Sequence, residues 1–319
     1  MHLNTYLIAA LTGALSLSTT VLATSKPTNF YARNLKTIST IYNLTVFPNN
    51  VPIITGGGAA VPKGLFSANA SGRVSPLGNF SGFEESIEYF FALALTPNEP
   101  SYSVFTNAKV VSFQSGCPEV AASVAYLETR VLNPNSTDNG KYLSTLKQVA
   151  FWRFDKQGAV IGYDAWIPNL NIWNFLARGE ADITNPFVQQ AFIQRICPAI
   201  QGLCTGANEQ YADVPACVAA MNSKPFGNYD EVWGDNVACR TIHLILAGVR
   251  PDAHCPHVGP DGGMKCVNEP YNHGYFDDED LFGKPSGETF VCPERRKEHK
   301  GYEIEGGEEE EQERMELMV

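Results

Sequence analysis

The stretch from Phe151 to Trp166, FWRFDKQGAVIGYDAW, decides the fold, because it contains two runs of β-branched and aromatic residues around a short turn at Gly158. Such runs favour strands, and the turn predicts that they pair as a hairpin. Side chains alternate between strand faces, which is expected to place one set inward and the other outward. The expected sets are Trp152, Phe154, Val160, Gly162, Asp164 and Trp166 against Phe151, Arg153, Ile161, Tyr163 and Ala165, with room for a shift of one residue across the turn.

Working outward, the residues before the hairpin predict more strands and two helices. Strands are expected at 108–113 and 123–132, helices at 31–42 and 84–94, and a long Gly- and Pro-rich loop at 51–78. After Pro168 the pattern becomes helical. Asn185 is expected to cap a helix with Pro186 in its first turn, and a helix at 235–249 should end before Pro251.

Composition excludes two classes of protein. The chain has 319 residues, 44% hydrophobic and 18% charged, with a formal net charge of -11. An acidic chain lacks the clustered Lys and Arg of a nucleic-acid-binding protein. The apolar run from Tyr6 to Leu22 is interrupted by polar residues and too short for a membrane span, which leaves a folded globular protein.

The N-terminus and the cysteines predict secretion. Val21-Leu22-Ala23 fits the small-residue rule of signal peptidase, so cleavage is expected after Ala23. Four glycosylation acceptors follow, at Asn43, Asn69, Asn79 and Asn135. Eight cysteines remain, Cys117, Cys197, Cys204, Cys217, Cys239, Cys255, Cys266 and Cys292, and their even number is typical of four disulfides in an oxidising compartment. Short loops favour the pairs Cys255–Cys266 and Cys197–Cys204, with Cys117 reaching the C-terminal half.

The helix Glu84-Glu85-Ser86-Ile87-Glu88-Tyr89-Phe90-Phe91-Ala92-Leu93, the strands and the hairpin together resemble the ketosteroid isomerase-like superfamily, also called nuclear transport factor two-like, which includes polyketide cyclase-like proteins. The likeness covers roughly residues 30 to 175. It implies an α+β fold in which a bent antiparallel sheet wraps on helices as a cone around an apolar pocket. The cysteine-rich part after residue 180 is outside that plan and is similar to that of uncharacterised secreted fungal proteins.

The resemblance implies a carboxylate general base and a tyrosine that stabilises an enolate. Asp164 is the candidate base, with Trp152, Phe154 and Trp166 as pocket residues, and Tyr163 and Tyr89 are candidate oxyanion donors. Each has a structural alternative: Asp164 pairing with Arg153 or facing solvent, and the tyrosines simply filling the core. Glu128 is the second carboxylate candidate, although an ion pair with Arg130 explains it equally well.

The segment containing Cys239, His243, His254, Cys255, His257 and Cys266 offers ligand types suited to zinc or copper. Against a metal site, an oxidising compartment converts cysteines to disulfides, and His254 and His257 are so close in sequence that a tight turn would be needed to aim both at one ion. No metal and no cofactor are therefore expected, and His257 beside the Gly-rich loop is expected to make a structural hydrogen bond.

These observations predict a signal peptide at 1–23, a helix and loop at 24–78, a ketosteroid isomerase-like domain at 79–175, a cysteine-rich helical extension at 176–293 and a disordered acidic tail at 294–319. The expected function is that of a cofactor-free isomerase or cyclase acting on an apolar polyketide-type, or maleic-anhydride, intermediate of fungal secondary metabolism. The alternative is a secreted non-catalytic ligand-binding or structural module. The expected partner is a small apolar molecule, and a homodimer through the sheet is left open.

Overall fold

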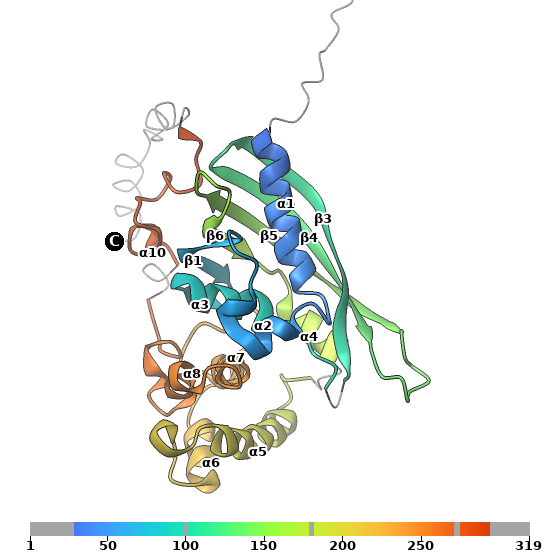
Figure 1. The fold of residues 1–319 in the computed structure, drawn as a ribbon. Helices are drawn as coiled ribbons and strands as arrows, with labels where there is room; N and C mark the ends of the chain where they lie inside the picture. The colour runs from blue at the N-terminus through green and yellow to red at the C-terminus, as the bar shows by residue number, and fades with distance from the viewer. Residues whose placement is uncertain (1–28, 99–100, 179–181, 271–274, 294–319) are drawn as a thin grey trace, which may run out of the picture.

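The computed structural model describes residues 29–98, 101–178, 182–270 and 275–293. A strongly bent six-stranded sheet wraps around helix α1 (Asn29–Leu44), and the C-terminal helices form a second layer below it (Figure 1). The α+β class and the cone expected from the sequence are therefore confirmed. The predicted signal peptide and acidic tail lie outside the described residues. Within the described ranges, no helix has the length and apolar character that a membrane span requires.

The sheet has the strand order β2-β1-β6-β5-β4-β3. Its strands are β1 (Phe66–Ser75), β2 (Gly78–Phe80), β3 (Ser103–Cys117), β4 (Val120–Val131), β5 (Tyr142–Phe154) and β6 (Val160–Trp166). All neighbours are antiparallel except β1 and β6, which run parallel. The hairpin read from the sequence is the β5–β6 pair at the centre of the sheet.

Short helices close the cone and continue into the extension. Near the sheet lie α2 (Val51–Gly56), the 3-10 turn η1 (Gly57–Ala60), α3 (Gly82–Ile87), the π-helical turn η2 (Glu88–Ala92) and α4 (Leu170–Arg178). The extension contains α5 (Pro186–Leu203), η3 (Gly206–Asn208), α6 (Val214–Asn222), α7 (Val237–Ala247), α8 (Pro251–Val258), η4 (Gly262–Met264) and α10 (Asp278–Phe282). Helix α7 lies between the cone and the α5–α6 pair (Figure 1). The predicted N-cap of α5 is confirmed, since the Asn185 side chain accepts from the Phe187 amide.

The predicted inward and outward faces of β6 are wrong by one residue from Gly162 onward. The register changes between Arg153↔Gly162 and Phe154↔Val160, so Ile161 is an extra residue in β6. Such a bulge reverses the face of every later side chain. Tyr163 therefore faces inward opposite Trp152, and Asp164 lies opposite the exposed Phe151.

The prediction of a long loop at 51–78 is also wrong, because this range contains α2, η1 and the whole of β1. Strand β1 reads FSANASGRVS, which is small and polar and has no strong strand pattern of its own. Its pairing partner β6 lies about 90 residues later in the sequence, as in the pair Arg73↔Asp164. A long-range pairing of this kind leaves little local signal.

All eight cysteines form disulfides, as predicted, but two predicted pairs are wrong. The bonds are Cys117–Cys292, Cys197–Cys217, Cys204–Cys255 and Cys239–Cys266. Cys197 and Cys204 are separated by two turns of α5, about 10 Å of helix rise, which exceeds the roughly 7 Å that a disulfide spans between Cα atoms. Cys255 of α8 is bonded to the end of α5 and Cys266 to α7, so they do not pair with each other. Cys117 reaches the C-terminal half as expected.

Candidate functional site

An apolar cavity lies inside the cone and is completed by the extension. The cavity, called here the cone pocket, has a volume of about 90 Å³. Its wall comes from α1, η2, the inner sheet face, α4 and, from α7, Ile242 and Ile245. The aromatic and aliphatic side chains include Phe90, Phe105 and Trp173. Helix α7 thus forms part of a pocket whose other walls belong to the sheet domain.

Two polar side chains meet in the wall of this pocket. The Gln148 amide donates to the Tyr89 hydroxyl, and both residues are buried. Burial raises the pKa of the Tyr89 hydroxyl well above its ordinary value, so the phenol stays neutral and can act as a donor. None of the described residues lining the cone pocket is Asp, Glu, Lys, Arg or His. The pocket is therefore suited to an apolar molecule with one oxygen placed at Tyr89.

A π-helical turn places two neighbouring side chains in different sites. Within η2, Tyr89 lines the cone pocket while Glu88 points to α8, where the carboxylate accepts from Arg250 Nε at 2.6 Å and from His254 Nε2 at 2.9 Å. Burial alone would raise the pKa of Glu88, but the bonds from His254 and Arg250 outweigh it and keep the pKa below its usual value. Single π-turns of this type are frequent at functional sites.

Beside Glu88 lies a group of three imidazoles, called here the histidine cluster: His243 of α7 with His254 and His257 of α8. His243 Nδ1 lies 3.4 Å from His254 Nδ1 and 3.1 Å from His257 Nδ1. Burial and the neighbouring imidazoles lower the pKa of His243 well below its usual value. Burial, followed by the charge of His254, lowers the pKa of His257 to about 4. The tight turn that was expected to be needed to aim His254 and His257 together is a turn of helix α8, because at i, i+3 they share one face of it.

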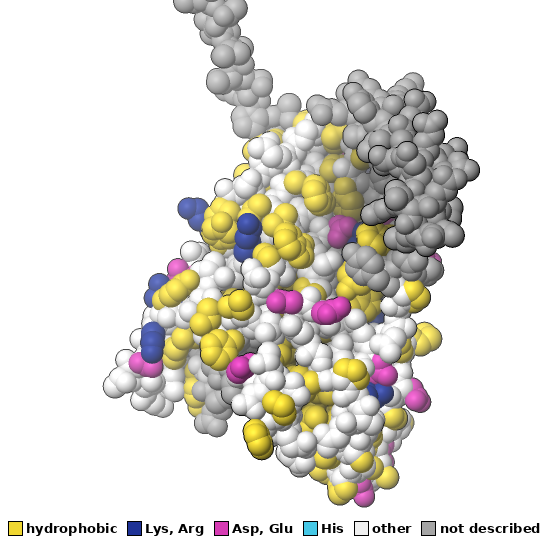
Figure 2. Space-filling view, turned by 180° about the vertical axis from the view of Figure 1, so that it is seen from behind, with side chains coloured by type: hydrophobic (Ala, Val, Ile, Leu, Met, Phe, Trp, Pro, Cys, Tyr) yellow, Lys and Arg dark blue, Asp and Glu magenta, His cyan; other side chains and the backbone are white. Residues whose placement is uncertain are grey.

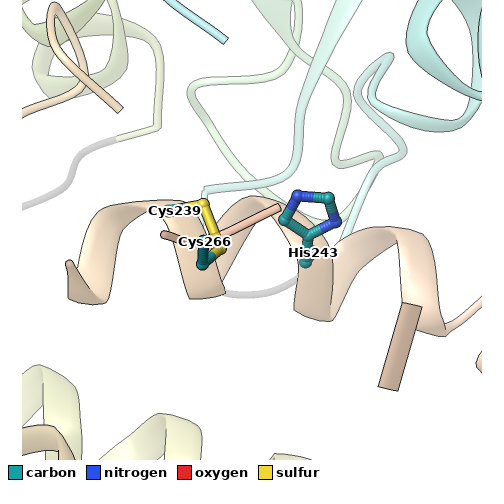
Figure 3. A group of neighbouring side chains, drawn as sticks. All are labelled: Cys239, His243 and Cys266. Atoms are coloured by element: carbon teal, nitrogen blue, oxygen red, sulfur yellow. A yellow bond between two sulfur atoms is a disulfide. The ribbon is translucent and has the colours of Figure 1, made fainter. Parts of the chain in front are cut away.

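A disulfide sits one helical turn from this cluster. Figure 3 shows Cys239 bonded to Cys266, with His243 one turn further along α7 on the same side. Because both sulfurs are bonded to each other, neither provides a thiolate ligand. The cysteines and histidines of this segment were the candidate metal ligands. Among the described residues every cysteine is in a disulfide, so only the imidazoles remain available as ligands.

The carboxylates expected to act as bases lie away from the cone pocket. Asp164 was expected among apolar side chains, but it is on the outer face and accepts from Arg73 at 2.6 Å, a guanidinium that also binds Asp278 at 2.8 Å. Glu128 pairs with Arg130 at 2.6 Å, in agreement with its structural alternative. Neither carboxylate is among the lining residues of the cone pocket.

The remaining predicted residues divide between core and surface. Tyr163 is fully buried, and its hydroxyl donates to Ser86 Oγ at 3.2 Å. Trp152 and Phe154 are buried core residues, whereas Trp166 is 56% exposed, so its expected place in the pocket is wrong. Tyr89 is the one predicted site residue that lines the cone pocket.

Sequence reasoning missed Gln148, Glu88 and the contribution of α7. Gln148 had a detectable signal, because it alternates with Leu146, Ala150 and Trp152 as the polar member of an inward strand face. Glu88 had none, since a glutamate at the edge of a helical stripe normally faces water. Its burial depends on contact with α8, more than 160 positions later in the chain.

Similarity to known proteins is found in the C-terminal part of the chain and over most of its length. Residues 167–269 match the BfoA family C-terminal domain. Bifonsecin B biosynthesis cluster protein A of Aspergillus brasiliensis is 28% identical over 241 residues, which cover 72% of this chain and 78% of that protein. Aurasperone B biosynthesis cluster protein A of Aspergillus niger is 28% identical over 243 residues, covering 72% and 76%.

Solved structures similar to the chain cover about half of it. A SnoaL-like polyketide cyclase from Jannaschia sp. CCS1 has 11% identity and a TM-score of 0.32, covering 48% of this chain and 96% of that one. A phenazine biosynthesis-related protein from Pseudomonas aeruginosa has 15% identity and a TM-score of 0.31, covering 49% and 93%. The bent sheet agrees with the fold that the resemblance implied, and the BfoA-type match covers most of the cysteine-rich extension.

Proposed function

We propose that this protein binds an apolar polyketide-type molecule in the cone pocket as part of fungal secondary-metabolite biosynthesis. One observation carries the proposal: the apolar cavity inside the cone, with the buried Tyr89–Gln148 pair as its hydrogen-bonding point and α7 across one side. The names of the cluster proteins similar to this chain support the setting, since both refer to biosynthesis of a named fungal metabolite.

The size of the cavity limits how such a molecule binds. Its volume of about 90 Å³ is well below the roughly 300–1,000 Å³ of common ligand pockets, so one flat ring fits inside and the rest of the molecule must extend out. A second hollow of about 290 Å³ shares Asn174 with the cone pocket and is bordered by Phe175, Ile183 and Tyr229. A fused-ring phenol with an apolar extension matches both spaces.

The binding test uses the fluorescence of Trp173, which lines the pocket. Ala94→Leu adds three carbons to the pocket wall and is expected to weaken binding of fused-ring aromatic phenols about 10-fold or more. The matched control is Ala122→Leu on the outer sheet face opposite Phe151, which should leave the affinity unchanged. Equal affinity in both variants would place the ligand elsewhere.

The finer proposal is an isomerisation or cyclisation in which Tyr89 donates to the oxygen that becomes negative. Tyr89→Phe should then bind ligand but lose roughly 10²-fold in rate, the usual worth of one such donor. A second candidate function, a non-catalytic binding module, is favoured by the lack of acidic and basic side chains among the described lining residues. Chromatography of a reactive poly-ketone incubated with the protein separates the two: tight binding without product supports the binding module.

We also propose the secretory pathway as its location, with a signal peptide at 1–23 and sugars on the acceptor asparagines. The four disulfides among the described residues support an oxidising compartment. The predicted domain bounds and a homodimer through the sheet stay proposals as well.

A further inference from the structure

The histidine cluster has a hydrogen-bonding conflict that three imidazoles alone do not resolve. The Glu88 carboxylate can only accept, so His254 Nε2 carries the proton and its Nδ1 presents a lone pair. His243 Nδ1 lies 3.4 Å from this His254 Nδ1. The same His243 Nδ1 lies 3.1 Å from His257 Nδ1. A single Nδ1 is either a donor or an acceptor in the neutral ring. If the neutral His243 ring carries its proton on Nδ1, this proton serves one of the two contacts. If it does not, the lone pairs of His243 Nδ1 and His254 Nδ1 face each other.

The distances match those around a bound metal. Zinc–imidazole bonds of roughly 2.0–2.1 Å at tetrahedral angles place ligand nitrogens about 3.3 Å apart. The two measured Nδ1 separations are 3.1 and 3.4 Å, and each of the three histidines offers a ligand atom within 4.8 Å of the others. An ion accepts all three lone pairs at once and removes the conflict.

The surroundings supply the outer ring of contacts that metal sites use. The bond from His254 Nε2 to Glu88 is the carboxylate–histidine pair that orients a ligand imidazole, and Arg250 fixes the same carboxylate from its other side. Gly263, at a left-handed φ of 52°, allows the loop after α8 to pass against Pro256 and His257, where a Cβ would lie 2.7 and 2.9 Å from their atoms. The rings are therefore held in place by packing on several sides.

Charge and space leave a position for one further ligand. The cavity beside His243 and His254, about 30 Å³ in volume, is also bordered by Glu85 and by Lys265, whose ammonium binds Glu85 at 3.1 Å. Glu85 pairs with Lys265 and Glu88 with Arg250, and the nearby Arg240 is paired with Asp235. The volume is sufficient for about one water.

We propose that His243, His254 and His257 bind a divalent transition-metal ion, with zinc as the ion of choice, and leave a fourth position open toward the cavity at Lys265. Three neutral imidazoles and an open position are the ligand set of catalytic zinc sites. The site is separate from the cone pocket but adjoins it, since Leu77 and Ile242 border both cavities. It stands independently of the proposed function, because metal binding is measured without any organic ligand.

The test uses the full mature chain from a secretory host, with all thiols oxidised and metal removed by chelation. Titration with Zn²⁺ alone should show one ion per chain, and Co²⁺ should give the intense visible absorption of a tetrahedral site. His257→Gln, at a partly exposed position, should weaken Zn²⁺ binding at least 100-fold. His299→Gln removes a histidine that is not one of the three proposed ligands, and as the control it should leave Zn²⁺ binding unchanged. Glu88→Gln keeps an acceptor for His254 without the charge and should cost about 10- to 100-fold.

Two results would overturn the assignment. One is the absence of stoichiometric Zn²⁺ uptake by the wild-type protein, measured together with a melting temperature to show that it is folded. The other is uptake that survives in His257→Gln, or that begins only after reduction of Cys239–Cys266, which would move the ion to the thiolates beside His243. A Tm that rises with Zn²⁺ in the wild type and not in His257→Gln supports the site independently of the titration.

Discussion

At the scale of single residues, Gly72 determines where the Tyr163 ring can lie. The two residues are register partners on the parallel strands β1 and β6. A Cβ added at Gly72 would be 2.1 Å from Tyr163 Cε2, far inside van der Waals contact. The ring has no free space to move into, since Tyr163 is fully buried and its hydroxyl is tied to Ser86. Glycine is needed here for close approach.

Gly72→Ala is therefore expected to lower the free energy of unfolding by about 1–3 kcal/mol, the usual cost of overpacking a core. Urea denaturation followed by fluorescence measures the change. The matched control is Gly202→Ala, in α5 with no atom within 4 Å of the added carbon, which should raise stability by up to about 1 kcal/mol. If both variants changed stability by the same amount and sign, the Tyr163 contact would not be the cause.

At the scale of elements, features that depend on neighbouring residues could be predicted from the sequence, whereas features that depend on contacts between distant segments could not. The Asn185 cap and the β5–β6 turn follow from neighbouring residues, and the structure has both. The bulge at Ile161 has no marker in the sequence, yet it moves Asp164 from the interior to the outer face. For the histidine cluster, neither helix α8, which puts His254 and His257 on one face, nor its packing on α7 beside His243 was predicted. The fold was thus largely predictable, whereas most of the site was not.

The disulfide joining α5 to α8 gives a prediction at this scale. Cys204–Cys255 closes a loop of 51 residues, and its removal by Cys204→Ala with Cys255→Ala is expected to cost about 2–4 kcal/mol of unfolding free energy. Proteolysis of the unreduced protein followed by mass spectrometry should recover the four pairs of the structure. Recovery of a Cys197–Cys204 peptide would contradict this arrangement of α5.

At the scale of the whole molecule, the extension completes the cone instead of forming a separate unit beside it. Helix α7 lines the cone pocket through Ile242 and Ile245, while His254 of α8 and Arg250, the residue before α8, bind Glu88 of the cone. Loss of these α7 and α8 contacts would change both candidate sites together.

The face of the molecule that lies behind the view of Figure 1 is shown in Figure 2, where hydrophobic side chains are spread among other side chains over the surface.

The surface also decides which acceptor asparagines can carry sugar in the folded protein. Asn43, Asn69 and Asn135 are exposed, whereas the Asn79 side-chain oxygen is buried and its backbone carbonyl accepts from Lys265. A glycan on Asn79 would have to displace this packing beside the histidine cluster.

We expect secreted material to begin at Thr24 and to carry sugar at the three exposed sites, with Asn79 unmodified. N-terminal sequencing and glycosidase treatment in heavy-oxygen water, read by mass spectrometry, measure both. A chain that keeps Met1, or one fully glycosylated at Asn79 and still folded, would contradict this view of its surface.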